Sequence, residues 1–144
     1  MTVTDESRSI VDACTRLSLD VARYTDARDI DAVTARYTED AVFERKGETL
    51  RGRAAIRAAQ EARPIEALTR HVCANTYVDV IDDDHAKGLI YFVLYRYDAP
   101  AGTEPLVPAK VAPPQTVGEF HDEYVRTPDG WRISRRTAIG IFRA

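Results

Sequence analysis

The sequence predicts an α+β protein in which N-terminal helices precede a mostly antiparallel sheet. Apolar residues recur every three to four positions before Pro64 and every second position after it, so helical segments come before strands. Turn residues separate neighbouring strands, as in a meander. The chain has 144 residues, the size of one ordinary domain, and we expect a single domain over residues 1–144.

The first part of the chain carries the helical periodicity. Apolar side chains from Ile10 to Tyr24 alternate at steps of four and three, which predicts a long amphipathic helix. Acids at Asp26 and Asp29 are suited to cap a second helix. The apolar pattern of that second helix continues to Tyr37.

A short strand, a turn and a third helix are expected next. Residues 41–45 partly alternate in polarity, and Gly47 is a turn signal. Residues 53–63 are rich in alanine and predict a helix. Pro64 ends that helix because proline cannot continue the helical hydrogen bonding.

The remaining residues predict two pairs of strands. Residues 68–81 and 89–97 form the first pair, joined by an acidic turn. Residues 117–126 and 131–142 form the second pair, joined by a Pro-Asp-Gly turn. The apolar run within the strand 89–97 predicts cover on both faces for part of the length of that strand.

Between the two pairs lies a proline-rich loop, residues 98–116, with five prolines. A connection of this length without regular structure is usually functional or mobile in a compact domain. We expect it to be a plain surface link, a lid over a pocket, or an oligomer contact.

Charge and hydropathy exclude several classes of partner. The net charge of −3 and the pI near 5.6 disfavour binding to nucleic acid or to an anionic membrane, since both require a basic surface. The N-terminal residues carry acids and do not resemble a signal peptide. The longest apolar run, 89–95, is too short to cross a bilayer. We therefore expect a cytoplasmic protein.

The cysteines and histidines predict neither a disulfide nor a metal site. Cys14 and Cys73 fall in a predicted helix and a predicted strand, where a reduced cysteine behaves as a small apolar residue. The three histidines, His71, His85 and His121, are far apart in sequence, and no metal-binding spacing occurs. We expect chemistry without a metal or another cofactor.

Two residues become candidates for catalysis only in combination. Asp26 follows the first helix and, taken alone, is best explained as a helix cap. His71 begins a strand, and strict alternation would place Cys73, Asn75 and Tyr77 on its face. An isolated histidine on a strand is more often structural than catalytic.

Five short motifs occur in order along the chain. They are Tyr24-Thr-Asp26-Ala-Arg-Asp29, Tyr37-Thr-Glu-Asp40-Ala-Val-Phe43, Arg51-Gly52-Arg53-Ala-Ala-Ile56, Arg70-His71-x-x-x-Asn75 and Pro128-Asp-Gly-Trp131-Arg-Ile. Together they resemble the SnoaL-like family of the nuclear-transport-factor-2-like superfamily, except in the proline-rich loop. This resemblance implies a cone-shaped, curved sheet that wraps around the N-terminal helices and encloses a pocket for a small molecule.

The resemblance extends to a branch that includes scytalone dehydratase and hexachlorocyclohexane dehydrochlorinase. It implies a His–Asp dyad formed by His71 and Asp26, with Arg136 at the position of a further functional arginine. Other functional positions of that branch differ in this chain, where they hold Val21, Arg45, Gly118 and Phe120. Neither specific activity is therefore carried over.

Such a dyad has a direct chemical rationale. A carboxylate that accepts a hydrogen bond from one ring nitrogen orients the imidazole, and the other nitrogen can then move protons near neutral pH. Arg136 is expected either to stabilise a developing anion or to pair with Asp26 or Glu119. Further substrate contacts are predicted from the residues Tyr24, Asn75, Tyr91, Tyr95 and Phe120.

We therefore expect a cofactor-free enzyme of dehydratase, isomerase or cyclase type that acts on a small, largely apolar substrate. The alternative is a non-catalytic ligand-binding or structural subunit of the same fold. The resemblance also implies a homodimer or homotrimer formed through the outer face of the sheet.

Overall fold

The computed structural model describes residues 4–110 and 113–144. Residues 1–3, in the predicted acidic N-terminus, and 111–112, in the predicted proline-rich loop, lie outside the described residues.

In chain order the elements are α1 (Asp5–Ala27), α2 (Ile30–Ala35), β1 (Tyr37–Arg45), β2 (Glu48–Arg51), α3 (Arg53–Glu61), β3 (Ala67–Asp82), β4 (His85–Asp98), β5 (Thr116–Thr127) and β6 (Gly130–Arg143). The six strands form one sheet in the order β2-β1-β6-β5-β4-β3. Only β1 and β6 pair in parallel, so the predicted α+β fold with a mostly antiparallel sheet is confirmed.

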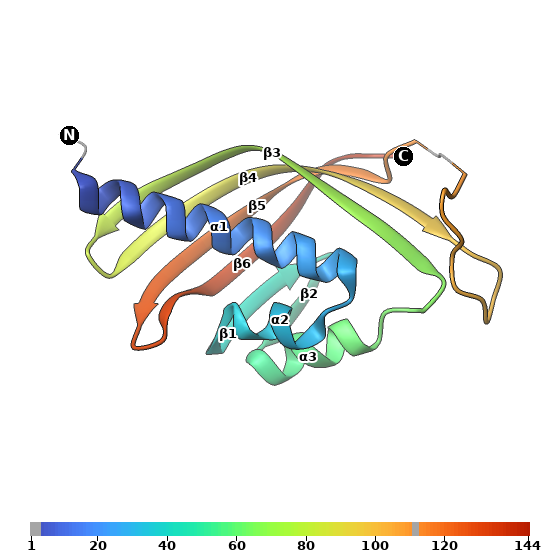
Figure 1. The fold of residues 1–144 in the computed structure, drawn as a ribbon, viewed down its shortest axis with the longest axis horizontal. Helices are drawn as coiled ribbons and strands as arrows, with labels where there is room; N and C mark the ends of the chain where they lie inside the picture. Colours follow the sequence, from blue (N-terminus) through green and yellow to red (C-terminus); the bar gives the residue numbers. More distant parts are fainter. Residues whose placement is uncertain (1–3, 111–112) are drawn as a thin grey trace.

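Helix α1 provides the surface on which the sheet packs. Thr4 caps its start by accepting a hydrogen bond from the backbone N–H of Ser7, and the buried stripe of the helix includes Ile10, Cys14 and Val21. Strands β3 to β6 arch over α1, while α2 and α3 lie on the other side of that helix (Figure 1). The main core therefore lies between α1 and the sheet.

The boundary between the second helix and the first strand differs from the prediction. Helix α2 ends at Ala35, and Tyr37 begins β1, where it aligns with Ile133 of β6. Tyr37 is buried in the core, so its apolar signal came from a strand and not from a further helical turn. The sequence pattern also did not indicate β2, which pairs with β1 across the turn at Gly47.

Strand β4 is buried on one face only, which corrects the prediction of cover on both faces. Ile90 is 1% exposed and Phe92 6%, whereas Tyr91 between them is 41% exposed. The outer face of this strand thus carries large apolar residues that the described chain leaves uncovered. Composition alone could not distinguish this arrangement from a doubly covered strand.

A β-bulge interrupts β3 in its middle. Cys73 aligns with Phe92 and Thr76 with Ile90, so three steps along β3 oppose two steps along β4. One extra residue moves all later side chains to the other face of the sheet. The predicted common face of His71, Cys73 and Asn75 therefore ends at Cys73, and Asn75 is exposed.

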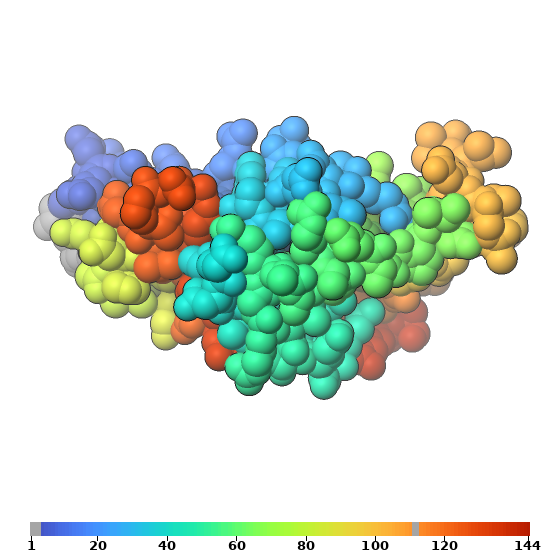
Figure 2. Space-filling view, turned by 90° about the horizontal axis from the view of Figure 1, so that it is seen from below, coloured from blue at the N-terminus to red at the C-terminus, as the bar shows by residue number. Residues whose placement is uncertain are grey.

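The proline-rich loop forms one end of the molecule, as the orange segment in Figure 2 shows. Its described part, residues 99–110 and 113–115, contains no helix or strand. The loop is anchored near its ends, because Gly102 N–H donates to Glu66 (2.8 Å) and Gln115 N–H donates to the Leu94 carbonyl (2.7 Å). The three roles expected for this loop, a surface link, a lid and an oligomer contact, stay predictions.

Candidate active site

Asp26 lies in the last turn of α1 and has no capping role. Asp29 is the residue that caps α2, by accepting a hydrogen bond from the backbone N–H of Ala32 at 3.0 Å. The C-terminal end of a helix carries partial negative charge, so a carboxylate there does not favour the helix. The capping role expected for Asp26 is therefore wrong, and its position requires another explanation.

His71 of β3 supplies two of the hydrogen bonds that hold Asp26. Strand β3 is an edge strand, paired only with β4, and the His71 backbone N–H is free to donate to Asp26 Oδ2 at 2.7 Å. The Nδ1 atom of the His71 ring lies 2.7 Å from Asp26 Oδ1. The Asp26 side chain is 9% exposed and that of His71 is 15% exposed. The structure thus brings the two dyad residues together.

The chemistry of the carboxylate determines the tautomer of the histidine. Burial alone raises the pKa of Asp26, but hydrogen bonds from the His71 ring, its backbone N–H and the Thr69 hydroxyl, together with the charge on His71, lower this pKa below its usual value. An ionised carboxylate only accepts hydrogen bonds, so Nδ1 carries the proton. In the neutral ring the lone pair of Nε2 is then available to take a proton from another molecule.

An apolar cluster borders the imidazole. The rings of Phe92 and Phe120 stack with their centroids 4.2 Å apart, and they lie 6.1 Å and 6.3 Å from the His71 ring. Ile90 completes the buried part of this cluster. The partly buried residues packed against it are Cys73, Leu94 and Ala138. The side of His71 that faces these rings is therefore apolar.

Arg136 does not join the dyad. Its Nε and Nη2 atoms donate to the two oxygens of Asp122, each at 2.7 Å, and the side chains are 2% and 0% exposed. Burial alone lowers the pKa of Arg136, but the facing carboxylate outweighs this effect and raises the pKa, so the guanidinium stays charged. Of the two expected roles the structure supports ion pairing, with Asp122 in place of Asp26 or Glu119.

Four of the predicted substrate contacts lie away from the dyad. Tyr91 and Tyr95 are exposed side chains of β4, and Asn75 is exposed next to the bulge. Tyr24 packs against the main core between Arg23 and Arg36, whose guanidinium carbons lie 4.9 Å and 4.8 Å from its ring centroid. Of the five predicted contacts, only Phe120 borders His71.

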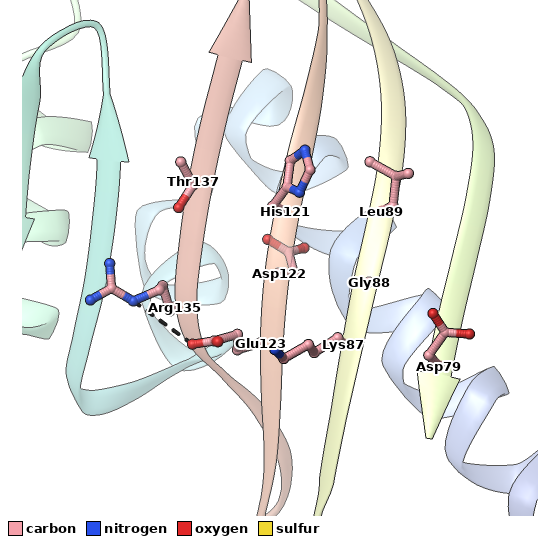
Figure 3. Close-up of a pocket in the computed structure, with 9 residues that line it drawn as sticks. All are labelled: Asp79, Lys87, Gly88, Leu89, His121, Asp122, Glu123, Arg135 and Thr137. Carbon is pink, nitrogen blue, oxygen red and sulfur yellow. Dashed lines mark ion pairs between the residues drawn. The ribbon is translucent and has the colours of Figure 1, made fainter. Parts of the chain in front are cut away.

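Two hollows on the described surface lie away from the dyad. One, of about 330 Å³, is on the outer face of the sheet and is lined by polar side chains such as Lys87, His121 and Arg135 (Figure 3). The other, of about 370 Å³, lies between the first turns of α1 and residues 78–80 of β3. Neither includes Asp26 or His71, so the enclosed pocket that the resemblance implies stays a prediction.

Residues 6–137 match the SnoaL-like domain family. The chain belongs to the SnoaL-like family. The resemblance inferred from its motifs is therefore confirmed, and the fold is of the nuclear-transport-factor-2-like type. No curated protein matches the sequence.

Solved structures share this SnoaL-like fold at low sequence identity. A protein from Novosphingobium aromaticivorans, provisionally described as a scytalone dehydratase, aligns with a TM-score of 0.81 and 18% identity over 99% of this chain and 91% of that one. A hexachlorocyclohexane dehydrochlorinase (LinA, type 2) gives 0.80 and 16% over 96% and 90%. ActVI-ORFA from Streptomyces coelicolor gives 0.74 and 19% over 92% and 98%. At these identities the likeness shows the fold alone.

The described part of the SnoaL-like chain contains no cluster of three or more side chains suited to bind a metal ion. Within the same residues, no helix is both long and apolar enough to cross a membrane.

Two residues beside the dyad were not predicted from the sequence. Thr69 donates its hydroxyl proton to Asp26 Oδ1 at 2.9 Å, and Arg63 Nη2 donates to Thr69 Oγ1 at 2.8 Å. Thr69 could have been found, because it lies two residues before His71 and alternation places both on one face. Arg63 follows the end of α3 and carries no periodic signal.

Proposed function

We propose that this SnoaL-like chain is a cofactor-free enzyme in which His71 is the general acid and base and Asp26 is its orienting partner. The observation that carries this proposal is the double contact of Asp26 with the ring and the backbone of His71, each at 2.7 Å. Two contacts fix both the tautomer and the direction of the ring. The ring nitrogen that remains is Nε2, and the imidazole ring itself borders the apolar cluster.

The reaction class follows from what a neutral imidazole can do. Nε2 takes a proton from a carbon next to a carbonyl group, and the electron pair of the broken C–H bond forms a new C=C or enolate bond. The imidazolium then returns its proton to a departing hydroxide, released as water, or to another carbon of the substrate. The first outcome is a dehydration, and the second is an isomerisation or a step toward ring closure.

The charge distribution around the dyad favours an uncharged substrate. Asp122 neutralises the guanidinium of Arg136, so Arg136 is not available as an anion-binding group. Phe92 and Phe120 give His71 an apolar, aromatic neighbourhood. We therefore propose a small aromatic carbonyl compound with an acidic C–H bond as the substrate class.

Ligand capture followed by turnover tests this proposal. Native mass spectrometry against a library of small aryl ketones and β-hydroxy ketones identifies ligands, and product analysis then reports their conversion. We expect His71→Gln to keep ligand binding and lose turnover, with His121→Gln as the matched control, because His121 also faces a carboxylate (Glu119, 3.0 Å) but is exposed. Binding without turnover by the wild type would instead indicate the non-catalytic alternative.

We also propose that the chain forms a homodimer or homotrimer through the outer face of the sheet. This face exposes large apolar side chains of β3, β4 and β6, namely Val72, Tyr91, Tyr95, Ile139 and Ile141. Apolar surface of this kind is typical of protein interfaces. Analytical ultracentrifugation should give the mass of two or three chains, and a monomer at micromolar concentration would contradict this.

A further inference from the structure

A line of hydrogen bonds continues behind the dyad, away from the free nitrogen of His71. Arg63 Nη2 donates to Thr69 Oγ1 at 2.8 Å, and Thr69 Oγ1 donates to Asp26 Oδ1 at 2.9 Å. From this geometry we infer that Thr69 and Arg63 are positioning residues, which hold the Asp26 carboxylate in the orientation that fixes the tautomer of His71. The inference rests on the proposed function for its catalytic consequence.

The direction of each hydrogen bond in this line follows from its chemistry. A guanidinium can only donate, so Thr69 Oγ1 accepts from Arg63. A hydroxyl has a single proton, and Asp26 can only accept, so that proton is directed to Asp26 Oδ1. Arg63 therefore removes the rotational freedom of the Thr69 hydroxyl, and the hydroxyl in turn restrains the carboxylate.

The burial of Thr69 makes this restraint effective. Thr69 is 7% exposed, so little water reaches its hydroxyl to compete for the same contacts. Asp26 Oδ1 receives both the Thr69 hydroxyl and His71 Nδ1, while Oδ2 receives the His71 backbone N–H. Without the hydroxyl, Oδ1 keeps one donor where it had two, and the carboxylate can rotate away from the ring.

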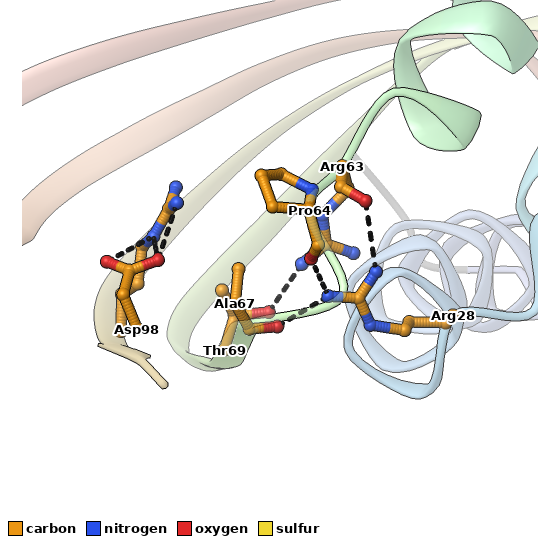
Figure 4. A network of polar contacts seen from close by, with 7 residues as sticks. Arg28, Arg63, Pro64, Ala67, Thr69 and Asp98 are labelled. Carbon is orange, nitrogen blue, oxygen red and sulfur yellow. Dashed lines mark hydrogen bonds and ion pairs between the residues drawn. The ribbon is translucent and has the colours of Figure 1, made fainter. Parts of the chain in front are cut away.

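The two arginines at this end of the molecule also join the elements that carry the dyad. Arg63 donates through Nη1 to the carbonyl of Thr25 in the last turn of α1. Arg28, the residue directly after α1, donates to the carbonyls of Pro64 and Ala67 before and at the start of β3, the latter at 2.6 Å (Figure 4). These contacts connect the end of α1, which carries Asp26, to the start of β3, which carries His71.

The tautomer of His71 can be measured without a substrate. The chain has three histidines, so ¹⁵N-histidine labelling gives a simple spectrum in which the His71→Gln variant identifies the signals of His71. We expect the wild type to show a protonated Nδ1 and an unprotonated Nε2 for His71. In Thr69→Val, which removes the hydroxyl at nearly constant volume, both signals should move toward the average of the two tautomers.

Two further variants separate positioning from a general structural effect. Thr69→Ser keeps a hydroxyl and should restore the wild-type signals. Thr76→Val removes a hydroxyl from the same strand, one that donates to the Ala74 carbonyl (3.0 Å) and not to the dyad, and should leave His71 unchanged. Unaltered His71 signals in Thr69→Val, or an equal change in Thr76→Val, would overturn the inference.

The role of Arg63 is tested in the same spectrum. Arg63→Met frees the Thr69 hydroxyl and should shift the His71 signals in the same direction as Thr69→Val. Arg57→Met is the matched control, because Arg57 bonds to Asp31 (2.7 Å) and Glu61 (3.1 Å) and not to this line. A wild-type His71 spectrum in Arg63→Met would remove Arg63 from the proposal.

Kinetics distinguish failure of this inference from failure of the proposed function. With a turned-over ligand, Thr69→Val should lower kcat by about 10- to 100-fold with little change in KM, the size seen for hydrogen-bond partners behind metal-binding histidines. Turnover that needs His71 but is unaffected in Thr69→Val would overturn the positioning role and leave the function standing. If the tautomer of His71 responds to Thr69→Val but the wild type turns over no ligand, the positioning role stands and the proposed function fails.

Discussion

Two acid–base pairs of this chain differ in what each leaves free: Asp122 and Arg136 face each other across one hairpin, whereas Asp26 and His71 come from α1 and β3. Asp122 and Arg136 are 0% and 2% exposed, and two parallel hydrogen bonds join them. Asp26 and His71 are slightly exposed, and no described residue bonds to His71 Nε2. The first pair is closed to other molecules, whereas the second keeps one proton-accepting atom available. Burial and pairing therefore indicate stability in one region, and the unpaired nitrogen indicates chemistry in the other.

The neighbours of the closed pair reinforce this difference. Ser18 of α1 donates to Asp122 Oδ2 at 2.6 Å and also lies 2.6 Å from the Tyr124 hydroxyl. This network therefore joins α1 to β5 and β6 inside the core. Near the dyad, the hydrogen bonds of Thr69 and Arg63 reach the carboxylate of Asp26 and not the ring of His71. They therefore orient the pair and leave Nε2 unbonded by these two residues.

The largest expected effect comes from opening the closed pair. Asp122→Ala leaves Arg136 charged and buried without a partner, and this should lower the free energy of unfolding by about 3–5 kcal/mol. Urea unfolding measures the loss. The double variant Asp122→Leu with Arg136→Met removes both charges and should recover most of it. A loss below about 1 kcal/mol in Asp122→Ala would show that the pair is not a structural element.

A smaller effect is expected from crowding the same network. A Cβ atom at Gly88 would lie 2.2 Å from the Tyr124 hydroxyl oxygen, so Gly88→Ala displaces the ring that contacts Ser18. Overpacking of this kind costs about 1–3 kcal/mol. Gly140→Ala is the control, because its nearest neighbour would lie at an ordinary 3.6 Å. Equal unfolding midpoints for the two variants would contradict the expectation.

The smallest effect concerns the acid stability that Asp26 contributes. Its pKa is lower in the folded chain than in the unfolded chain, so the unfolded chain binds more protons between the two values, and stability rises with pH there. The contribution is complete above the unfolded pKa of about 3.9 and is lost as pH falls through the folded pKa. Asp26→Asn should therefore flatten the decrease in unfolding free energy below about pH 4. Asp129→Asn controls for the loss of an exposed carboxylate, and identical slopes for Asp26→Asn and the wild type would contradict this prediction.

The sequence predicted the fold to the extent that periodicity determines it. The change from helical to alternating spacing gave the element order, and short motifs identified the family. Periodicity could not separate the end of α2 from the start of β1, because a buried apolar residue such as Tyr37 fits the pattern of a helix as well as that of a strand. It also could not reveal the bulge after Cys73, which depends on how β3 aligns with β4.

The candidate site was predicted in part for the same reason. Asp26 and His71 were found through family motifs, while Arg136 was given the wrong partner. Its true partner, Asp122, lies directly across from it on β5, and this register is a property of strand pairing. Tyr91 and Tyr95 were predicted to line a cavity and contact substrate, but both are exposed, on the face of β4 that points outward.

Proton exchange in D₂O tests the central claim, that His71 is a base, most directly. Small ketones that carry an aromatic ring, such as β-tetralone, exchange the protons next to the carbonyl with the solvent, and NMR follows this exchange. The wild type and His121→Gln should accelerate it equally, whereas His71→Gln should lose about 10²–10⁴-fold of the acceleration. Exchange by His71→Gln as fast as by the wild type, or no acceleration of any ketone by the wild type, would contradict the account.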